Sequence, residues 1–338
     1  MKSLASLGEF PFIEAIGRFA RSESSASGVV VGIGDDAAQL RLGRNAIVTV
    51  DTLIEGVHFR RAWLSPTELG RRAFRVAVSD IAASGADPRF VLLALAAPAA
   101  YPARDALALV GGLVNDARSV GAALVGGNVA RSPVLALTVT VIGAKGARFL
   151  ARDRARIGDL IYVTGPLGGA ASAVKQLEKK RRGPSASRSR VGAASSLAAY
   201  RKPPLRVATA SALGRLSPIG AAIDVSDGLV QDLGHVCSAS HVSAAIEPAA
   251  VPVARGATLA DALYGGDDYE LLFTVRPGAA SQRAVVAACR STKSRAAMIG
   301  RIVSRGPAAV VSSEDGRPLA GGYAHFARSV RLAKGRRS

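Results

Sequence analysis

Carboxylate side chains are unevenly placed in this sequence. Twelve of its 25 acidic residues fall in five short clusters, most of them beside apolar stretches. In a chain with 44 Lys and Arg residues, such clusters are not needed for solubility, and grouped carboxylates need cations. We therefore expect them to be cation-binding groups. The clusters are Asp35 and Asp36; Asp51 and Glu55; Asp80 and Asp87; Asp224, Asp227 and Asp232; and Asp267, Asp268 and Glu270.

The first cluster follows a short apolar strand, in the sequence VVVGIGDDA of residues 29–37. Its G-x-G-x-x-A pattern is similar to a dinucleotide-binding turn, with Asp51 as the ribose ligand. However, only about a dozen residues separate this strand from the next, which is short for a helical crossover. Asp35 and Asp36 would also repel a pyrophosphate, unless a divalent cation lies between carboxylate and phosphate. A hairpin with a Gly-Asp turn is the other interpretation.

Two further acidic residues lie at or within apolar elements. Asp51 closes the strand of residues 46–50, and His58 follows it by seven residues in the next loop. Ligands of α/β folds bind at strand ends, so Asp51 and His58 are candidate site residues. Asp80 lies in a helix of small residues among apolar neighbours, where an unpaired charge is costly. The alternative is that Ser79 or Asp80 caps the N-terminus of a helix.

Three glycine-containing segments add candidate phosphate and metal contacts. The sequence VGGNVA ends a strand with two glycines, where bare backbone can approach a phosphate. Residues 221–229 place Asp224, Ser226 and Asp227 at the end of a strand, before a helix. Two carboxylates and a hydroxyl at a glycine turn indicate a metal-phosphate site. Residues 264–273 repeat the pattern in mirror order, with the acids before the strand.

These segments lie on two successive sets of strands and helices. Apolar runs predict an α/β first half and a second α/β set after residue 150. The expected domains are residues 1–148 and 149–338, and residues 178–196 are expected to form a flexible basic loop. The expected strands are 29–33, 46–50, 90–96, 122–125, 134–142, 160–164, 221–225 and 270–275, and the expected helices are 68–83, 105–120 and one after Gly168-Gly169.

The net charge of +19 and the pI near 11.0 raise the possibility of a nucleic-acid partner. Most of the positive charge is Arg mixed with Ala along the whole chain, and it is concentrated only in residues 175–190 and 328–337. Both segments lack the interleaved aromatic residues on which bases stack. We therefore do not expect nucleic-acid binding as the main function.

Membrane and secreted proteins are not favoured either. The longest apolar run, residues 91–100, is too short to span a bilayer, and the N-terminus has no signal-peptide pattern. The two cysteines, Cys237 and Cys289, are far apart and form no C-x-x-C pair. This cysteine usage indicates a reducing, cytoplasmic environment without disulfides or a thiolate zinc site.

Eight motifs, in this order and over nearly the whole chain, resemble the thiamine-monophosphate kinase family. They are GIGDDA, VDTLIEGVHF, SDIAASGADP, GGN, DLIYVTG, AIDVSDGL, GGDDYELLFTV and GGYAHF. The related aminoimidazole ribonucleotide synthetases, selenophosphate synthetases and hydrogenase-maturation proteins share the architecture but not this full set. The resemblance implies a two-domain α/β fold with mixed sheets covered by helices, and a homodimer formed through the N-terminal domain. It also implies ATP- and Mg²⁺-dependent phosphorylation of thiamine monophosphate to thiamine diphosphate.

The resemblance also implies roles for individual residues. Asp51, Asp80 and Arg152 would be catalytic, and His58, Asp267 and Tyr323 would face thiamine monophosphate. ATP would contact Gly127, Asn128, Arg152 and Ser226. Several Mg²⁺ ions would be held by Asp36, Thr49, Val50, Asp51, Asp80, Asn128, Asp224 and Asp227.

The chain departs from the usual family pattern at four positions. Asn128 replaces a usual Asp, which keeps an oxygen ligand but removes a charge, and Val50 has only its backbone carbonyl to offer a metal. Ala77 stands where Asn is usual, and Asp267 where Glu is usual. Two other functions therefore stay open. One is another ATP-using enzyme of the same superfamily, and the other is a catalytically weakened relative that binds nucleotides or nucleic acid.

Overall fold

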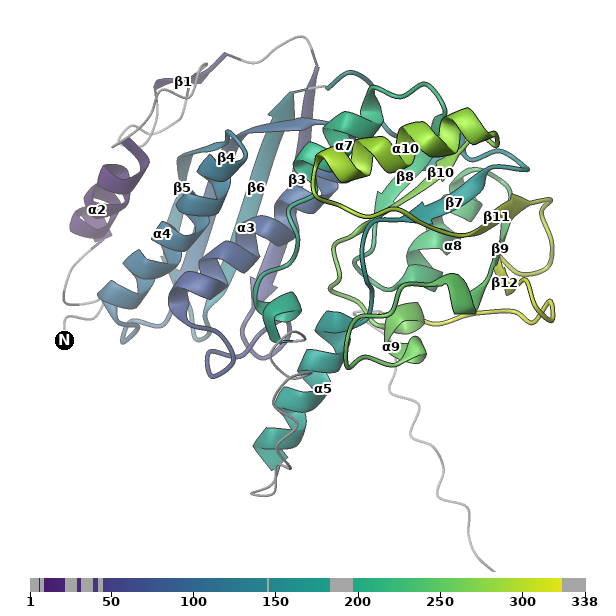
Figure 1. Ribbon diagram of the computed structural model, residues 1–338. Coiled ribbons are helices and arrows are strands. Elements are labelled where there is room, and N and C mark those ends of the chain that lie inside the picture. The colour runs from purple at the N-terminus through teal and green to yellow at the C-terminus, as the bar shows by residue number, and fades with distance from the viewer. Residues whose placement is uncertain are drawn as a thin grey trace, which may run out of the picture.

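The computed structural model describes residues 6, 9–21, 29–31, 39–41, 45–144, 146–182 and 197–323. Two α/β halves lie side by side, each built on its own sheet, with helix α3 (Pro66–Ala83) in the half that carries the first sheet (Figure 1). The fold is therefore mixed α/β, as the sequence predicts. Within the described part of the chain, none of the helices has the length and hydropathy that crossing a membrane requires.

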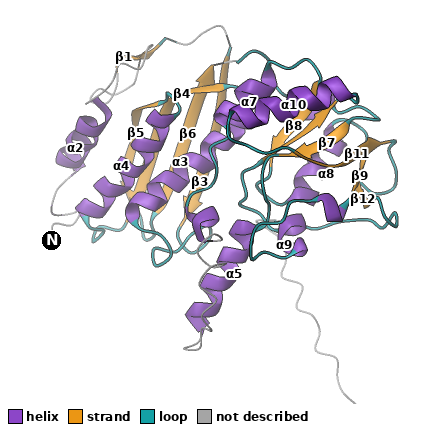
Figure 2. Cartoon of the chain, in the orientation of Figure 1, coloured by secondary structure: helices purple, strands orange, loops and turns teal. Residues whose placement is uncertain are grey.

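The first sheet has four strands in the order β3-β6-β4-β5. The β4–β5 pair is parallel, and the other two pairs are antiparallel. Helices α3 and α4 cover one of its faces (Figure 2). The strands are β3 (Ala46–Ile54), β4 (Asp87–Ala97), β5 (Ala123–Arg131) and β6 (Ala136–Ala144), and α4 is Ala103–Ser119.

Alternation along β3 decides which of its side chains can reach helix α3. Ile47, Thr49 and Asp51 are partly buried, whereas Val48 and Val50 between them are each 60% exposed. Successive side chains of a strand point to opposite faces, so Thr49 and Asp51 lie on the face that α3 covers. The opposite face of this edge strand presents two valines to solvent.

Helix α3 begins well before its acidic end. Pro66 is its first residue, and Ser65 and Glu68 form a capping box at its N-terminus. The interpretation of Ser79 or Asp80 as an N-cap is therefore wrong, because both lie in the last turns of the helix. Gly70 allows α4 to pack closely, since a Cβ there would lie 1.8 Å from the carbonyl oxygen of Leu109.

The second sheet has six strands in the order β12-β9-β11-β7-β10-β8. Its hydrophobic residues form two clusters, one that includes residues of α7 and α10 and one that includes residues of α8 and α9. The first cluster is continuous with the core of the other half. The strands are β7 (Leu160–Val163), β8 (Ile219–Asp224), β9 (Ser243–Ile246), β10 (Leu271–Val275), β11 (Ala297–Val303) and β12 (Val310–Ser312). The helices are α5 (Gly169–Arg182), α7 (Val207–Gly214), α8 (Leu229–Ala239), α9 (Leu259–Tyr264) and α10 (Ala279–Ser291), with short 3-10 helices η1 (Arg152–Arg154) and η2 (Pro248–Ala250).

Several predicted boundaries need correction. Strand β3 continues to Ile54, so Asp51 does not close it, and β5 continues to Arg131, so the glycine pair of residues 126–127 does not end it. Strand β1 (Val29–Val31) pairs antiparallel with β2 (Gln39–Leu40) in a separate sheet, which agrees with the argument against a parallel dinucleotide-binding unit here. The predicted start of the basic loop at residue 178 is also wrong, because helix α5 continues to Arg182. Lys, Glu and Arg are good helix formers, and the first strong helix breakers are Gly183 and Pro184.

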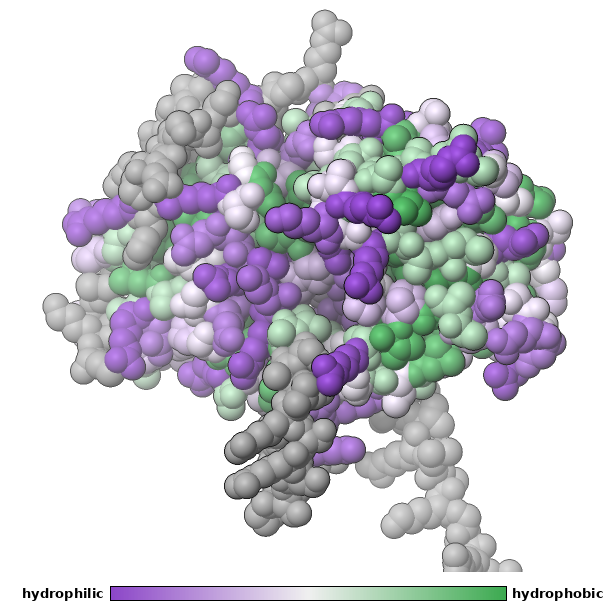
Figure 3. Space-filling model, in the orientation of Figure 1, coloured by the Kyte–Doolittle hydropathy of each residue, from purple (hydrophilic) through white to green (hydrophobic). Residues whose placement is uncertain are grey.

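Several other predicted features lie outside the described residues. They are Asp35 and Asp36, the loop from 183 to 196, and the basic C-terminal segment 328–337. The remaining N-terminal element is helix α2 (Glu9–Arg21). Hydrophilic residues are spread across the face of the molecule shown in Figure 3, including its middle.

Candidate functional site

Asp51 and Asp80 meet between the first sheet and helix α3. The hydroxyl of Thr49 on β3 donates a hydrogen bond of 2.7 Å to Oδ2 of Asp80 near the end of α3. Burial, and to a smaller extent the negative charge of Asp80, raise the pKa of Asp51 to about 6. These two carboxylates therefore lie close enough to repel each other and share one electrostatic environment.

A third carboxylate comes from the other half of the chain. Asp224 is the last residue of β8 and is 3% exposed, and its Oδ2 accepts a hydrogen bond of 2.6 Å from the hydroxyl of Ser79. Burial, and to a smaller extent the negative charge of Asp80, raise the pKa of Asp224 to about 7. Asp80 thus interacts with both Asp51 and Asp224, and the three acids form one group at the junction of the two halves.

The turn that follows β8 is organised by Asp232 in the first turn of α8. Its Oδ2 accepts hydrogen bonds from the backbone N–H groups of Ser226, Asp227 and Gly228, at 3.0, 3.0 and 3.1 Å. Burial raises the pKa of Asp232 to about 7 despite these three donors. The carboxylate of Asp232 therefore fixes the backbone that carries Ser226 and Asp227.

Tyr323 lies beside the same turn. Its backbone N–H donates to the carbonyl of Asp227 at 2.9 Å, and its own carbonyl accepts a bond of 2.7 Å from Nε2 of Gln231. Gln231 Nε2 also donates to Oδ2 of Asp227 at 3.1 Å. Ligand atoms of Asp227, Asp232 and His235 lie within 4.8 Å of one another, so this turn offers a second group of oxygen and nitrogen donors.

The acidic GGDDYE segment lies next to this turn because of the sheet order. Strand β10 is antiparallel to β8, and Leu271 at its start pairs with Asp224 at the end of β8. The backbone N–H of Asp267 donates to the carbonyl of Ser226 at 2.8 Å. Asp267 and Tyr269 adopt positive φ angles of 74° and 52°, which cost free energy for residues other than glycine.

The other two acids of that segment point to structural partners. Asp268 is buried and accepts a hydrogen bond of 2.7 Å from the N–H of Gly168, and burial raises its pKa to about 8. Glu270 accepts two bonds from Arg206, at 2.5 and 2.6 Å. Asp268 therefore holds the start of α5, and Glu270 anchors Arg206 before α7.

Asn128 and Gly127 lie away from this site within one chain. They are on β5, at the opposite edge of the first sheet from β3, three strand spacings or roughly 14 Å away. Asn128 is paired across the sheet with Ala94 of β4, which is paired with Thr138 of β6 and then with Thr52 of β3. Thr52 is on the same face as Val48 and Val50, so Asn128 is on the face that α3 and α4 do not cover. Gly127, at φ +155°, has no room for a Cβ, which would lie 1.9 Å from the Leu93 carbonyl oxygen.

Three other predicted site residues lie on separate elements, namely Val50, Arg152 and His58. The side chain of Val50 points to the uncovered face, so only its backbone could face a metal ion near Asp51. Arg152 in η1 has an exposed side chain, and its carbonyl accepts a bond of 2.8 Å from Ser240 Oγ. His58 accepts a hydrogen bond of 3.0 Å at Nδ1 from the N–H of Ile54.

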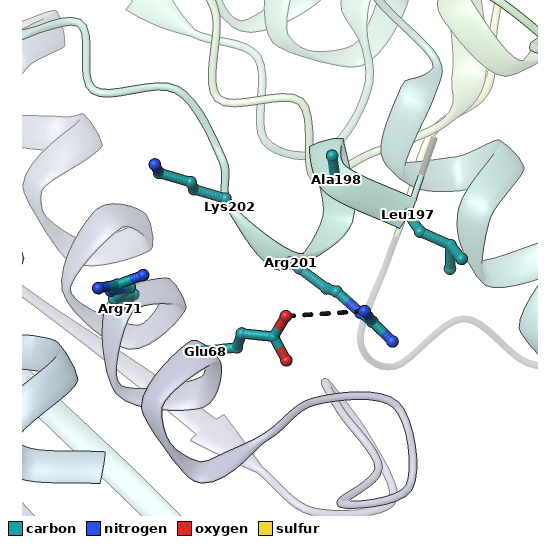
Figure 4. A pocket seen from close by; sticks show the side chains of 6 residues that line it. All are labelled: Glu68, Arg71, Leu197, Ala198, Arg201 and Lys202. Carbon is teal, nitrogen blue, oxygen red and sulfur yellow. Dashed lines mark ion pairs between the residues drawn. The ribbon is translucent and has the colours of Figure 1, made fainter. Parts of the chain in front are cut away.

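A pocket of about 410 Å³ lies at the other end of α3 (Figure 4). Arg201 and Glu68 form an ion pair of 3.6 Å in it. Glu68 is twelve residues before Asp80 on the same helix, roughly 18 Å along its axis, so the pocket is separate from the carboxylate cluster. Its lining residues are Glu68, Arg71, Leu197, Ala198, Arg201 and Lys202.

Sequence reasoning missed the polar face that α3 turns toward the second half. Arg72, Arg75 and Ser79 contact Asp267, Pro203 and Asp224 respectively. Their spacing of three and four residues places them on one face of a helix. That spacing among buried small and apolar residues was the available signal, but polar residues at helical spacing more often mark a solvated face.

Family models match both halves of the chain. Residues 34–144 match the AIR synthase related protein, N-terminal domain, and residues 156–312 match the AIR synthase related protein, C-terminal domain. Thiamine-monophosphate kinase of Bacillus subtilis (strain 168) is 36% identical over 263 residues, 74% of this chain and 78% of that protein. The corresponding kinase of Escherichia coli (strain K12) is 35% identical over 279 residues, 79% of this chain and 82% of that protein. The chain belongs to the thiamine-monophosphate kinase family. The resemblance stated from the motifs is thereby confirmed.

Solved structures of the family share this fold. Thiamine-monophosphate kinase from Stenotrophomonas maltophilia K279a has a TM-score of 0.79 and 33% identity, and the match covers 92% of this chain and 98% of that one. AaThiL complexed with AMPPCP and TMP has a TM-score of 0.73 and 27% identity, covering 96% and 99% of the two chains. The Escherichia coli hydrogenase maturation protein HypE, at 21% identity and a TM-score of 0.72, shares the fold alone.

Proposed function

We propose that this chain transfers the terminal phosphoryl group of ATP to thiamine monophosphate, forming thiamine diphosphate. The observation that carries the proposal is the convergence of Asp51, Asp80 and Asp224 from three elements and both halves of the chain. Family relatives named for this activity support it, as does the related structure that holds an ATP analogue with TMP.

The reaction needs positioning and charge neutralisation more than a base. The second pKa of a phosphate monoester is near 6, so the acceptor oxygen is already largely ionised at neutral pH. Repulsion between two polyanions is the main obstacle. The chain's own contribution is to hold donor and acceptor in line, with the positive charge of Arg152 near the phosphates. No side chain has to remove a proton from the acceptor.

The donor set suits Mg²⁺, which prefers hard oxygen ligands. Burial and mutual repulsion raise the pKa values of Asp51 and Asp224, so a cation among these carboxylates would relieve an existing cost. Thr49 supplies a further oxygen beside Asp80, and Asp227 supplies one from the turn that follows Asp224. Asp36 lies outside the described residues. When bound, Mg²⁺ supplies positive charge between the carboxylates and the ATP phosphates.

The remaining assignments follow the family pattern and the positions of the residues. We assign ATP to the side of the cluster that holds Ser226 and Arg152. We assign thiamine monophosphate to the side that holds Asp267, Tyr323 and His58. Asp267 and Tyr323 both bond the turn of residues 226–227 through their backbone N–H groups, which supports a common acceptor site.

We also propose that the protein acts as a homodimer in the cytoplasm, with the expected domains 1–148 and 149–338. The uncovered face of the first sheet, with Val48 and Val50 each 60% exposed, supports an interface there. Asn128 belongs to the same face, so it lies apart from Asp51, whose side chain is on the face that α3 covers. The two described cysteines are buried and unpaired, as suits a reducing compartment.

A direct assay tests the reaction. Purified protein incubated with ATP, Mg²⁺ and thiamine monophosphate should produce thiamine diphosphate and ADP in equal amounts, measured by chromatography. Omitting Mg²⁺ should abolish the product. ATP consumption with another phosphate acceptor, but not with thiamine monophosphate, would contradict the proposal and indicate another member of the superfamily.

Asn128→Asp is expected to lower the Mg²⁺ concentration for half-maximal activity. The family pattern assigns residue 128 to the ATP and Mg²⁺ site. There an added carboxylate would restore a full charge, and cation sites with more carboxylates bind more tightly. A Mg²⁺ titration of both proteins at fixed ATP measures the difference. Superimposable titrations would mean that residue 128 does not approach the metal in either copy.

A further inference from the structure

Arg72 is a buried cation that joins the two halves of the molecule. It lies on α3 and is 1% exposed, and its Nη2 forms an ion pair of 2.8 Å with Oδ1 of Asp267. Its Nη1 donates a hydrogen bond of 2.6 Å to the carbonyl of Tyr200. The guanidinium carbon lies 4.3 Å from the centre of the Tyr200 ring and 6.0 Å from that of Tyr269.

The groups around Arg72 all lead to segments of the acceptor site. The hydroxyl of Tyr269 donates to the same Oδ1 of Asp267, at 2.9 Å. The hydroxyl of Tyr200 donates to the carbonyl of His58 at 3.1 Å. One guanidinium thus fixes the carboxylate of Asp267 and, through Tyr200, the loop that carries His58.

The Asp267 loop has a backbone that needs such support. Asp267 and Tyr269 have positive φ angles, which non-glycine residues adopt only when their surroundings hold them there. Their N–H groups donate to the carbonyls of Ser226 and Val225, both at 2.8 Å, and these residues follow the Asp224 strand. Asp232 holds the turn of residues 226–228 separately, so a shift of the Asp267 loop can leave Ser226 and Asp227 in place.

A guanidinium is better suited than an ammonium to this position. Its planar fork points one nitrogen to Asp267 and another to the Tyr200 carbonyl while its face stacks on the Tyr200 ring. A lysine has a single nitrogen and lacks the planar face, so it retains only part of this set. The Nε–H of Arg72 has no hydrogen-bond partner among the described residues, so orientation depends on the two Nη groups and the stacking.

We propose that Arg72 is a positioning residue for the phosphate acceptor, which acts by holding the Asp267 carboxylate and the loop of residues 265–270 in place. The inference rests on the proposed function for the identity of the acceptor. It predicts that Arg72 governs the acceptor side of the reaction and leaves the ATP side nearly unchanged.

Kinetics of Arg72→Lys and Arg72→Met test the prediction. The KM for thiamine monophosphate should rise about 10- to 100-fold, since a misplacement of about 1 Å can cost about 100-fold, while the KM for ATP should stay within about twofold. In an Asp267→Asn background, Arg72→Lys should have little further effect, because the group that it positions is already altered. Equal changes in both KM values would overturn the inference.

Arg75→Met is the matched control. Arg75 is also a buried arginine of α3, with an ion pair to Asp116 and a hydrogen bond of 2.5 Å to the carbonyl of Pro203, but it does not contact the Asp267 loop. Arg72→Met and Arg75→Met each remove a buried ion pair, so both substitutions should lower the thermal unfolding temperature. Only the Arg72 variants should raise the KM for thiamine monophosphate.

Hydrogen exchange separates this inference from the proposed function. The amides of Asp267 and Tyr269 should exchange at least about tenfold faster in Arg72→Lys than in the unmodified protein, and at an unchanged rate in Arg75→Met. This measurement needs no substrate. If the unmodified protein fails to phosphorylate thiamine monophosphate, the proposed function falls and exchange alone decides the positioning role. Unchanged exchange in the Arg72→Lys protein would refute that role.

Discussion

Asp80→Asn and Asp51→Asn are each expected to reduce phosphoryl transfer by at least about 100-fold and to leave the protein folded. Asp80 is the acid that interacts with both Asp51 and Asp224, so its removal takes charge from the centre of the cluster. Asn has nearly the same shape and can still accept the hydrogen bond from Thr49. Initial rates at saturating ATP and thiamine monophosphate measure the loss.

The fold of both variants should persist because the removed charges repel each other. Circular dichroism and thermal unfolding should show a native protein that is no less stable than the original in the absence of Mg²⁺. Asp315→Asn is the control, since Asp315 is an exposed acid in a turn far along the chain from the cluster. Full activity of either site variant at the usual Mg²⁺ concentration would contradict the assignment of Asp51 and Asp80 as metal ligands.

The sequence predicted the parts of the site that depend on local pattern. Asp51 and Asp224 follow runs of apolar residues with strand character, and both lie in or at the end of a strand in the structure. Asp80 follows a stretch with helical spacing and lies in the last turns of α3. The expectation that acids lie at strand ends is confirmed for Asp224 and wrong for Asp51, because β3 continues to Ile54.

The parts that could not be predicted depend on contacts between distant segments. Asn128 directly follows a glycine pair, which predicted a strand end with a phosphate-binding turn. In the structure β5 continues to Arg131, and the order β3-β6-β4-β5 places Asn128 at the far edge. Strand order is set by packing of the whole half and leaves no local mark in the sequence. The burial of Arg72 could not be predicted for the same reason. Arg72 is buried because the second half of the chain packs against it, and the local sequence does not show that contact.

In the carboxylate cluster, the charged form of Asp224 that would bind a metal ion also lowers the stability of the metal-free protein. Asp224 has a pKa of about 7 in the folded protein, above its ordinary value of 3.8. Between these two pH values the folded state binds more protons than the unfolded state, so stability falls as pH rises through this range. The cost is fully present above pH 7 and disappears near pH 4.

Asp224→Asn should therefore stabilise the metal-free protein at pH 8, by on the order of 3 kcal/mol, or several degrees in the unfolding temperature. An amide has no charge to bury and can still accept the hydrogen bond from Ser79. The difference between variant and original should shrink as the pH is lowered to 5, because the original protein then carries the proton that removes the cost.

Mg²⁺ should reverse the order of the two proteins. A cation that binds the charged carboxylates raises the unfolding temperature of the original protein, and more at pH 8 than at pH 5.5, because protons compete with it. The Asp224→Asn protein should respond weakly at either pH and should have lost transfer activity. The unfolding temperatures of both proteins, measured with and without Mg²⁺ at pH 8 and at pH 5.5, test these expectations. An equal Mg²⁺ response in both proteins would show that Asp224 is not a ligand, and equal metal-free stability at pH 8 would show that its charge is not buried at a cost.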